Sequence, residues 1–195
     1  PKDEKQHKVT LRKGFWMWQT EVTQGQYKAL MGKNPSHYKT CGLRCPVEFV
    51  TFAKAALFAN ALSRRQGLTE CFTSDGKQLK AQYRGSQRYD TCDGWRLPTE
   101  SEWEFAALAG GKRKHNCRSF DPDRRLSLEA WTRYNSLNKT HPVGSLLPNE
   151  IGLYDMLGNV HEWTWDIYIP YVELPDKGDA AQVLINPVSP YQQVS

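Results

Sequence analysis

One segment, residues 148–166, constrains this chain more than any other, and it reads PNEIGLYDMLGNVHEWTWD. Its two glycines, Gly152 and Gly158, allow backbone shapes that other residues resist. Oxygen-bearing side chains recur along it at short intervals, at Asp155, Asn159, Glu162 and Asp166. The segment therefore predicts a tight local fold in which side-chain and carbonyl oxygens converge, and such convergence suits a hard cation such as calcium.

The length of 195 residues is enough for one domain with a hydrophobic core. We expect a single domain over 1–195, cut short at its C-terminus and trimmed at its N-terminus, where the chain starts without Met. Hydrophobic residues (39%) and charged residues (24%) are typical of a folded globular protein. The seven Trp are numerous, and they fit either a buried core or an aromatic interaction face.

The charge pattern favours a solvated surface rather than a nucleic-acid interface. The net charge is +5, and the basic residues are scattered in short runs without a recognisable RNA- or DNA-binding motif. No apolar run approaches the ~18–20 residues of a membrane span. We therefore expect neither a nucleic-acid partner nor a transmembrane segment, and the oligomeric state is left open.

Cysteine placement suggests disulfides and an oxidising compartment. Four cysteines lie in polar, turn-rich segments, and we predict the pairs Cys41 with Cys45 and Cys71 with Cys92, leaving Cys117 single. This pattern indicates an extracytoplasmic protein, periplasmic, surface-bound or secreted, of the bacterial secreted or lipoprotein type. Two alternatives remain: a zinc site that uses His37 with the first cysteine pair, and a reduced cytoplasmic chain.

Three helices are predicted from their start signals. Thr23 with Gln26, and Thr99 with Glu102, form capping boxes, and Thr51 can cap a third helix of roughly fifteen residues. Extended structure is predicted over 9–22 and 46–50, and a long loop or irregular hairpin over 68–94. Capped helices among short strands and long loops predict an irregular α+β domain.

Four stretches in this order carry a resemblance to a known family. They are TEVTQGQY at 20–27, CPVEFVTF at 45–52, GWRLPTESEWE at 94–104 and GLYDMLGNVHEW at 152–163. Together they resemble the formylglycine-generating-enzyme (sulfatase-modifying-factor) domain family over nearly the whole chain. The resemblance implies a C-type-lectin-like α+β fold with three short helices, small antiparallel sheets and many loops.

The resemblance also implies a structural calcium site within the opening segment. Its ligands would be the Asp155 side chain, the backbone oxygens of Gly158 and Val160, and the Glu162 carboxylate. Two carboxylates and two carbonyls around one ion agree with the preference of calcium for oxygen. The alternative is that Asp155 and Glu162 cap turns or pair with an arginine such as Arg96.

The resemblance implies an activity that these residues do not supply. The enzyme that names the family oxidises a sulfatase cysteine to formylglycine with a copper(I) ion held by two cysteines near the C-terminus, and soft thiolates select that ion. This sequence ends before the motif that precedes them, so no catalytic residue is assigned. We therefore expect a non-catalytic, calcium-stabilised module that binds a protein or peptide. The alternative is a copper-dependent oxidase whose cysteines lie beyond Ser195.

Overall fold

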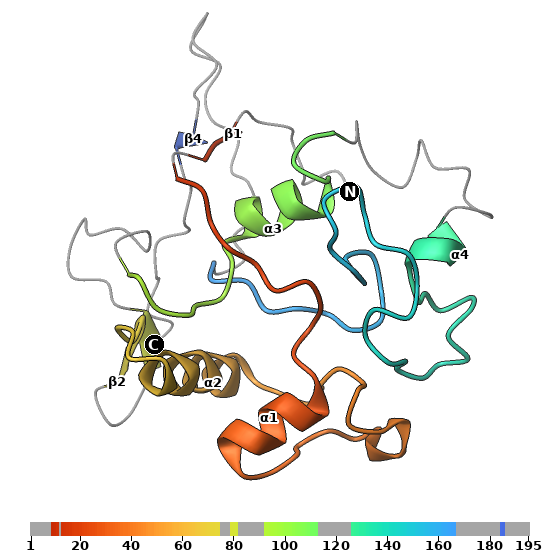
Figure 1. The fold of residues 1–195 in the computed structure, drawn as a ribbon, viewed down its shortest axis with the longest axis horizontal. Helices are drawn as coiled ribbons and strands as arrows, with labels where there is room; N and C mark the ends of the chain where they lie inside the picture. The colour runs from red at the N-terminus through yellow and green to blue at the C-terminus, as the bar shows by residue number, and fades with distance from the viewer. Residues whose placement is uncertain are drawn as a thin grey trace, which may run out of the picture.

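Helices and very short strands are set in long irregular segments, as the sequence predicts for an α+β domain. The computed structural model describes residues 9–11, 13–74, 79–81, 92–112, 126–166 and 184–185. In chain order the elements are β1 (Val9–Thr10), α1 (Gln24–Met31), the 3-10 turn η1 (Lys39–Cys41), α2 (Phe52–Arg65), β2 (Phe72–Ser74), β3 (Leu79–Ala81), α3 (Glu100–Ala107), α4 (Leu126–Glu129) and β4 (Leu184–Ile185). Helix α1 lies beside α2, and α3 lies across the middle of the molecule from them (Figure 1).

Three helices begin where the sequence predicts, because a threonine caps each one. The Thr23 hydroxyl accepts from the backbone N–H of Gln26 at 3.1 Å, and the Thr99 hydroxyl accepts from that of Glu102 at 3.2 Å. In both helices, the side chain of the third helical residue accepts a hydrogen bond from the backbone N–H of the capping threonine, which completes a capping box. Thr51 caps α2 with its hydroxyl alone. The short elements η1 and α4 were not predicted.

The predicted strands at 9–22 and 46–50 are mostly wrong. Strand β1 covers only the first two residues of the former range, and the rest of it that is described runs without regular pairing. In the latter range Pro46 forms one isolated bridge with Thr23. Phe49 has φ of 62°, in the left-handed region that a bulky residue rarely adopts, so an extended strand cannot continue through it.

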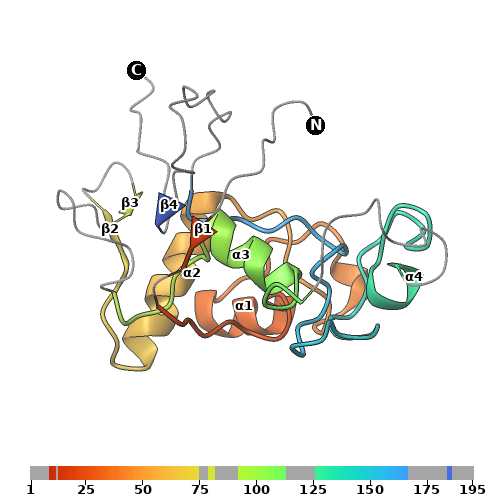
Figure 2. The ribbon, with the colours of Figure 1, turned by 90° about the horizontal axis from the view of Figure 1, so that it is seen from above.

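The two small sheets differ in direction. Strands β2 and β3 pair antiparallel, which gives the predicted irregular hairpin within 68–94. Strands β1 and β4 pair in parallel, with Val9 opposite Leu184, where only antiparallel sheets were expected. Figure 2 shows this parallel pair between the hairpin and α3, with α4 at the far end of the molecule.

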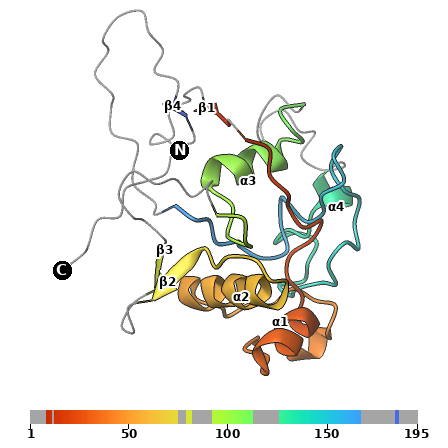
Figure 3. The ribbon, with the colours of Figure 1, turned by 60° about the vertical axis from the view of Figure 1, so that its left-hand side comes forward.

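Among the residues that the structure describes, the core consists of two buried clusters, and segment 148–166 contributes to both. One cluster comprises Ala56, Ala59, Cys71, Phe72 and Trp165, and the other comprises Ala106, Ala107, Leu153 and Met156. The rings of Trp165 and Phe72 lie 4.7 Å apart. The segment passes between α2 and α3 in two views (Figures 1 and 3). It therefore joins the α2 side of the core to the α3 side.

Both predicted disulfides are present, Cys41 with Cys45 and Cys71 with Cys92. This pairing contradicts the alternative zinc site with His37, because a cysteine in a disulfide has no thiolate to offer a metal. Cys117 lies outside the described residues. Among the helices that are described, none is long and apolar enough to cross a membrane.

Gly94 is predicted to be a sensitive position for the fold. A Cβ added there would lie 1.8 Å from the carbonyl oxygen of Thr69 and 2.7 Å from the hydroxyl of Ser63. Because backbone must move to admit it, Gly94→Ala should lower the free energy of unfolding by about 3 kcal/mol. Gly14→Ala is the control, since no atom lies within 4 Å of its added Cβ, and it should change stability by less than about 0.5 kcal/mol in urea denaturation. Equal effects would contradict the packing that we describe.

Candidate functional site

The loop at 152–160 owes its shape to four residues with special backbone requirements. Gly152, Asp155 and Asn159 have φ of 85°, 58° and 67°, a region that glycine, Asp and Asn tolerate best. Gly158 serves another purpose, because a Cβ there would lie 2.3 Å from the carbonyl oxygen of Trp131. The neighbouring Asn159 N–H donates to that same oxygen at 2.7 Å. Close backbone approach, rather than φ, therefore explains the second glycine.

Asp155 is buried, with only one of its two carboxylate oxygens satisfied. The residue is 3% exposed. Its Oδ2 accepts from the backbone N–H of Gly144 at 2.7 Å, while Oδ1 has no hydrogen-bond partner. Burial raises the pKa of this carboxyl group above its usual value. The carboxylate is thus held in place by one oxygen and leaves the other oxygen for a ligand.

Glu21 faces the same site, and the sequence prediction missed it. Both of its carboxylate oxygens are buried, and when Glu21 is ionised neither of them receives a hydrogen bond. When protonated, Glu21 lies close enough to Asp155 to donate a hydrogen bond to that carboxylate. Burial, reinforced by repulsion from Asp155 and Glu162, raises the pKa of Glu21 from 4.5 to about 9. The backbone N–H of Tyr154 donates to the carbonyl oxygen of Gln19 at 2.8 Å and so joins the segment that carries Glu21 to the loop. Three carboxylates therefore influence one another here.

Glu162 lies at the edge of this acidic cluster of Glu21, Asp155 and Glu162. As a whole residue it is exposed, and its carboxyl group lines the wall of a cavity, where neighbouring protein atoms partly desolvate it. This desolvation raises the pKa of Glu162, and repulsion from Asp155 adds to the effect. The indole N–H of Trp103, on α3, donates to Oε2 of Glu162 at 3.2 Å, and this hydrogen bond partly offsets the rise in pKa. The hydrogen bond positions the carboxylate without neutralising it.

Backbone oxygens would be needed to complete a metal site. Among the described residues, no three His, Cys, Asp or Glu side chains are grouped as a metal site on their own. The carbonyl oxygens of Gly158 and Val160, the other predicted ligands, accept no hydrogen bond from any described residue. Arg96, the alternative partner for the acids, forms a bidentate ion pair with Glu102, with both N···O distances at 2.7 Å.

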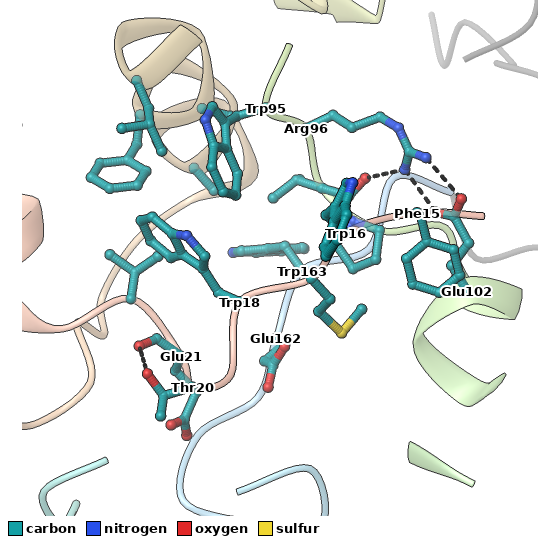
Figure 4. A pocket seen from close by; sticks show the side chains of 18 of the residues that line it. Phe15, Trp16, Trp18, Thr20, Glu21, Trp95, Arg96, Glu102, Glu162 and Trp163 are labelled. Atoms are coloured by element: carbon teal, nitrogen blue, oxygen red, sulfur yellow. Dashed lines mark hydrogen bonds and ion pairs between the residues drawn. The ribbon is translucent and has the colours of Figure 1, made fainter. Parts of the chain in front are cut away.

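Next to the acidic cluster is a cavity of about 800 Å³ with aromatic walls. Its lining comes from segments far apart in the sequence, mainly 13–22, 47–68, 92–98 and 154–163. In Figure 4, Trp18, Trp95 and Trp163 stand above the carboxylates of Glu21 and Glu162. The rings of Trp18 and Trp95 lie 5.0 Å apart at 53°.

The indole N–H groups of two wall residues are bonded to the framework of the protein. Trp95 donates to Oε1 of Gln66 at 2.7 Å, and Trp163 donates to the carbonyl oxygen of Val50 at 2.8 Å. Satisfied in this way, the rings are fixed in orientation. Trp16, also in the lining, is 98% exposed. The sequence could not distinguish this aromatic face from ordinary core.

Comparison with known proteins decides the family. The model of the sulfatase-modifying factor enzyme 1-like domain matches residues 2–186. The chain belongs to this sulfatase-modifying-factor family. A relative named chaperone protein LppX, of Paenibacillus barcinonensis, is 34% identical over 180 residues, which cover 78% of this chain and 62% of that protein. A formylglycine-generating enzyme of Streptomyces coelicolor is 39% identical over 94 residues, covering 42% of this chain and 30% of the enzyme.

Solved structures of the sulfatase-modifying-factor type confirm the predicted C-type-lectin-like fold. Treponema denticola variable protein 1 superposes with a TM-score of 0.64 at 33% identity and covers 82% of this chain. The chain spans 63% of that protein and 62% of the LppX protein, so it represents less than two thirds of either relative.

Proposed function

We propose that this sulfatase-modifying-factor domain is a binding module, whose aromatic cavity is built on a loop stabilised by calcium. The observation that carries the proposal is the buried pair of acids Glu21 and Asp155, three of whose four carboxylate oxygens receive no hydrogen bond when both groups are ionised. A buried charge without a partner is costly, and the cost is relieved either by protonation, as the raised pKa of Glu21 indicates for the metal-free protein, or by a bound metal ion. The cavity beside these oxygens gives the module a place to hold a ligand.

The donor set fits calcium. Asp155 and Glu162 offer carboxylate oxygens, Gly158 and Val160 offer carbonyl oxygens, and Glu21 adds a third negative charge beside them. All of these are hard oxygen donors, which calcium prefers and softer metals do not. The bound ion would neutralise the repulsion among the acids and would fix the segment that joins the two core clusters. Its role would be structural.

Removing calcium should therefore lower stability. At a free calcium concentration a hundred times Kd, binding would contribute about 2.7 kcal/mol to the free energy of unfolding. We expect EGTA to lower Tm, calcium to restore it, and magnesium to restore it poorly because magnesium demands a stricter octahedral geometry. Thermal unfolding followed by circular dichroism, with metal analysis of the purified protein, measures this. An unchanged Tm together with no bound metal would show that the protein has no structural calcium site.

Two observations favour binding over the family's oxidation chemistry. Four of the five cysteines are joined in disulfides, so the described residues cannot supply the two thiolates that copper(I) requires. One relative is named a chaperone, which supports a protein or peptide as the ligand. The direct test is a copper-dependent assay of the intact protein on a Cys-x-Pro-x-Arg peptide. We expect no formylglycine by mass spectrometry, and its formation would replace the binding module with the oxidase.

The disulfides also support an extracytoplasmic location, because such bonds persist in oxidising compartments. We expect fractionation of producing cells to recover the protein outside the cytoplasm, with all four paired cysteines resistant to alkylation before reduction. Recovery in the cytoplasm with the same four cysteines reactive would favour the reduced alternative.

A further inference from the structure

The cavity has aromatic rings in its walls and an acidic floor, formed by the carboxyl groups of Glu21 and Glu162. Neither a hydrophobic core nor a purely apolar pocket would need these acids. Three tryptophans, Trp18, Trp95 and Trp163, line its walls. Two of them have their indole N–H groups committed elsewhere, so what they offer a ligand is ring surface rather than hydrogen bonds. The face of an indole ring carries negative potential and attracts cations.

The charges around the cavity point the same way. Glu162 and Glu21 line it from the loop side (Figure 4). Arg96 also lines it, but its guanidinium is paired with Glu102 by two bonds of 2.7 Å. The lining also contains Lys13 and His161, and both residues are solvent-exposed. Negative charge therefore dominates near the loop, while the nearest buried cation is already neutralised.

The bound calcium ion would not cancel this field. Without metal, the raised pKa of Glu21 keeps this group protonated at neutral pH. A bound calcium ion would favour the ionised form of the carboxyl groups beside it. With Glu21, Asp155 and Glu162 all ionised, three negative charges would then face the two positive charges of the ion, and the floor would keep one net negative charge. Low-dielectric walls of indole strengthen the attraction between that charge and a cation inside the cavity. A neutral ligand would gain the apolar contact but would desolvate the floor without compensation.

We propose that this cavity binds an organic ammonium group, with Trp18, Trp95 and Trp163 around the cation and Glu162 beneath it. The site recognises a bulky, weakly hydrated cation on a ligand or a peptide side chain. This inference rests on the proposed binding function and assigns the ligand its chemical class.

Choline and its neutral isostere 3,3-dimethylbutan-1-ol separate charge from shape, since a carbon replaces the nitrogen in a group of the same size. Titration of the intact protein in calcium-containing buffer, followed by tryptophan fluorescence, measures both. We expect saturable binding of choline and binding of the isostere at least about five- to thirtyfold weaker, the range expected of a cation–aromatic contact. Equal affinity for the two would overturn the proposal in favour of an apolar site, and no saturation by either would overturn it outright.

A variant locates the effect in the cavity. Trp18→Leu keeps an apolar side chain but removes the ring face, and should weaken choline binding more than binding of the isostere. Tyr134→Ala is the control, because Tyr134 is 96% exposed and lies outside the cavity lining. Unchanged choline affinity in Trp18→Leu would contradict the assignment, and the comparison of the two probes on the unaltered protein stands even if the variant folds poorly.

Failure of the ammonium site can be distinguished from failure of the calcium site. Trp18 belongs to neither the predicted ligands nor the acidic cluster, so the EGTA-induced change in Tm should be the same in Trp18→Leu as in the unaltered protein. A calcium-dependent Tm without choline binding would overturn only the ammonium site. Choline binding without a calcium effect would retain the ammonium site and remove the metal.

Discussion

Replacing Cys71 and Cys92 together with alanine should lower the free energy of unfolding by about 3 kcal/mol. The disulfide closes a loop of sequence separation 21, and the constraint it places on the unfolded chain accounts for most of that figure. Cys71 is fully buried in the cluster with Phe72 and Trp165, so lost packing acts in the same direction. Urea denaturation with m-values compared between the proteins measures the change.

The disulfide between Cys41 and Cys45 provides a matched control. Its sequence separation is only 4, so loop closure predicts a smaller loss, about 2 kcal/mol, on replacing both with alanine. Each pair contains one fully buried cysteine, Cys71 in one and Cys45 in the other, which makes the packing loss comparable. A larger loss from the shorter loop would show that strain or packing, rather than loop length, determines these contributions.

The helix starts were predictable because their causes are local. A threonine and a glutamine or glutamate three residues later are enough to begin a helix, and Thr23 and Thr99 do so in the structure. The disulfides were predictable for a related reason, because turn-rich segments brought the right cysteines into proximity. Where a few neighbouring residues determine the outcome, one sequence is sufficient.

Apart from the hairpin of β2 and β3, the strands were not predictable, because their pairing depends on distant parts of the chain. Extended structure was predicted at 46–50, yet Phe49 turns into the left-handed region and the backbone leaves the strand path. Strand β1 pairs with β4, which comes from the other end of the described chain. Propensity in short strands is weak, and tertiary contacts override it.

The candidate site was half predictable for the same reason. Asp155 and Glu162 were named because they and the glycines share one short segment. Glu21 was missed because the fold alone brings it to them. One signal could have revealed it: the capping box of α1 uses Thr23 and Gln26 and gives Glu21 no role, so an acid in a family motif had no structural explanation.

Replacing Glu21 with glutamine should stabilise the metal-free protein while weakening its response to calcium. The carboxylate has two buried oxygens without partners, and burial holds its pKa at about 9 against 4.5 without the fold. At pH 7 that difference corresponds to a destabilisation on the order of 3 kcal/mol, which glutamine would relieve. A raised pKa of an acid means that stability is greatest at low pH. In EGTA, the free energy of unfolding should therefore fall as pH rises from about 4.5 toward 9, and Glu21→Gln should flatten that fall.

In calcium the same substitution should act in the opposite direction, because the ion loses a negative neighbour. A tenfold loss of calcium affinity would remove about 1.4 kcal/mol of the stabilisation that calcium provides. Urea denaturation at pH 5 and pH 8, with and without EGTA, measures both effects, and Glu104→Gln is the control because Glu104 is exposed on α3. Destabilisation of Glu21→Gln in EGTA would mean that its carboxylate supports the metal-free fold. An undiminished calcium response would place Glu21 outside the metal's influence. The expected pair of effects requires an acid that must take up a proton in the empty site, which costs stability, and that is ionised beside the bound ion, which strengthens binding.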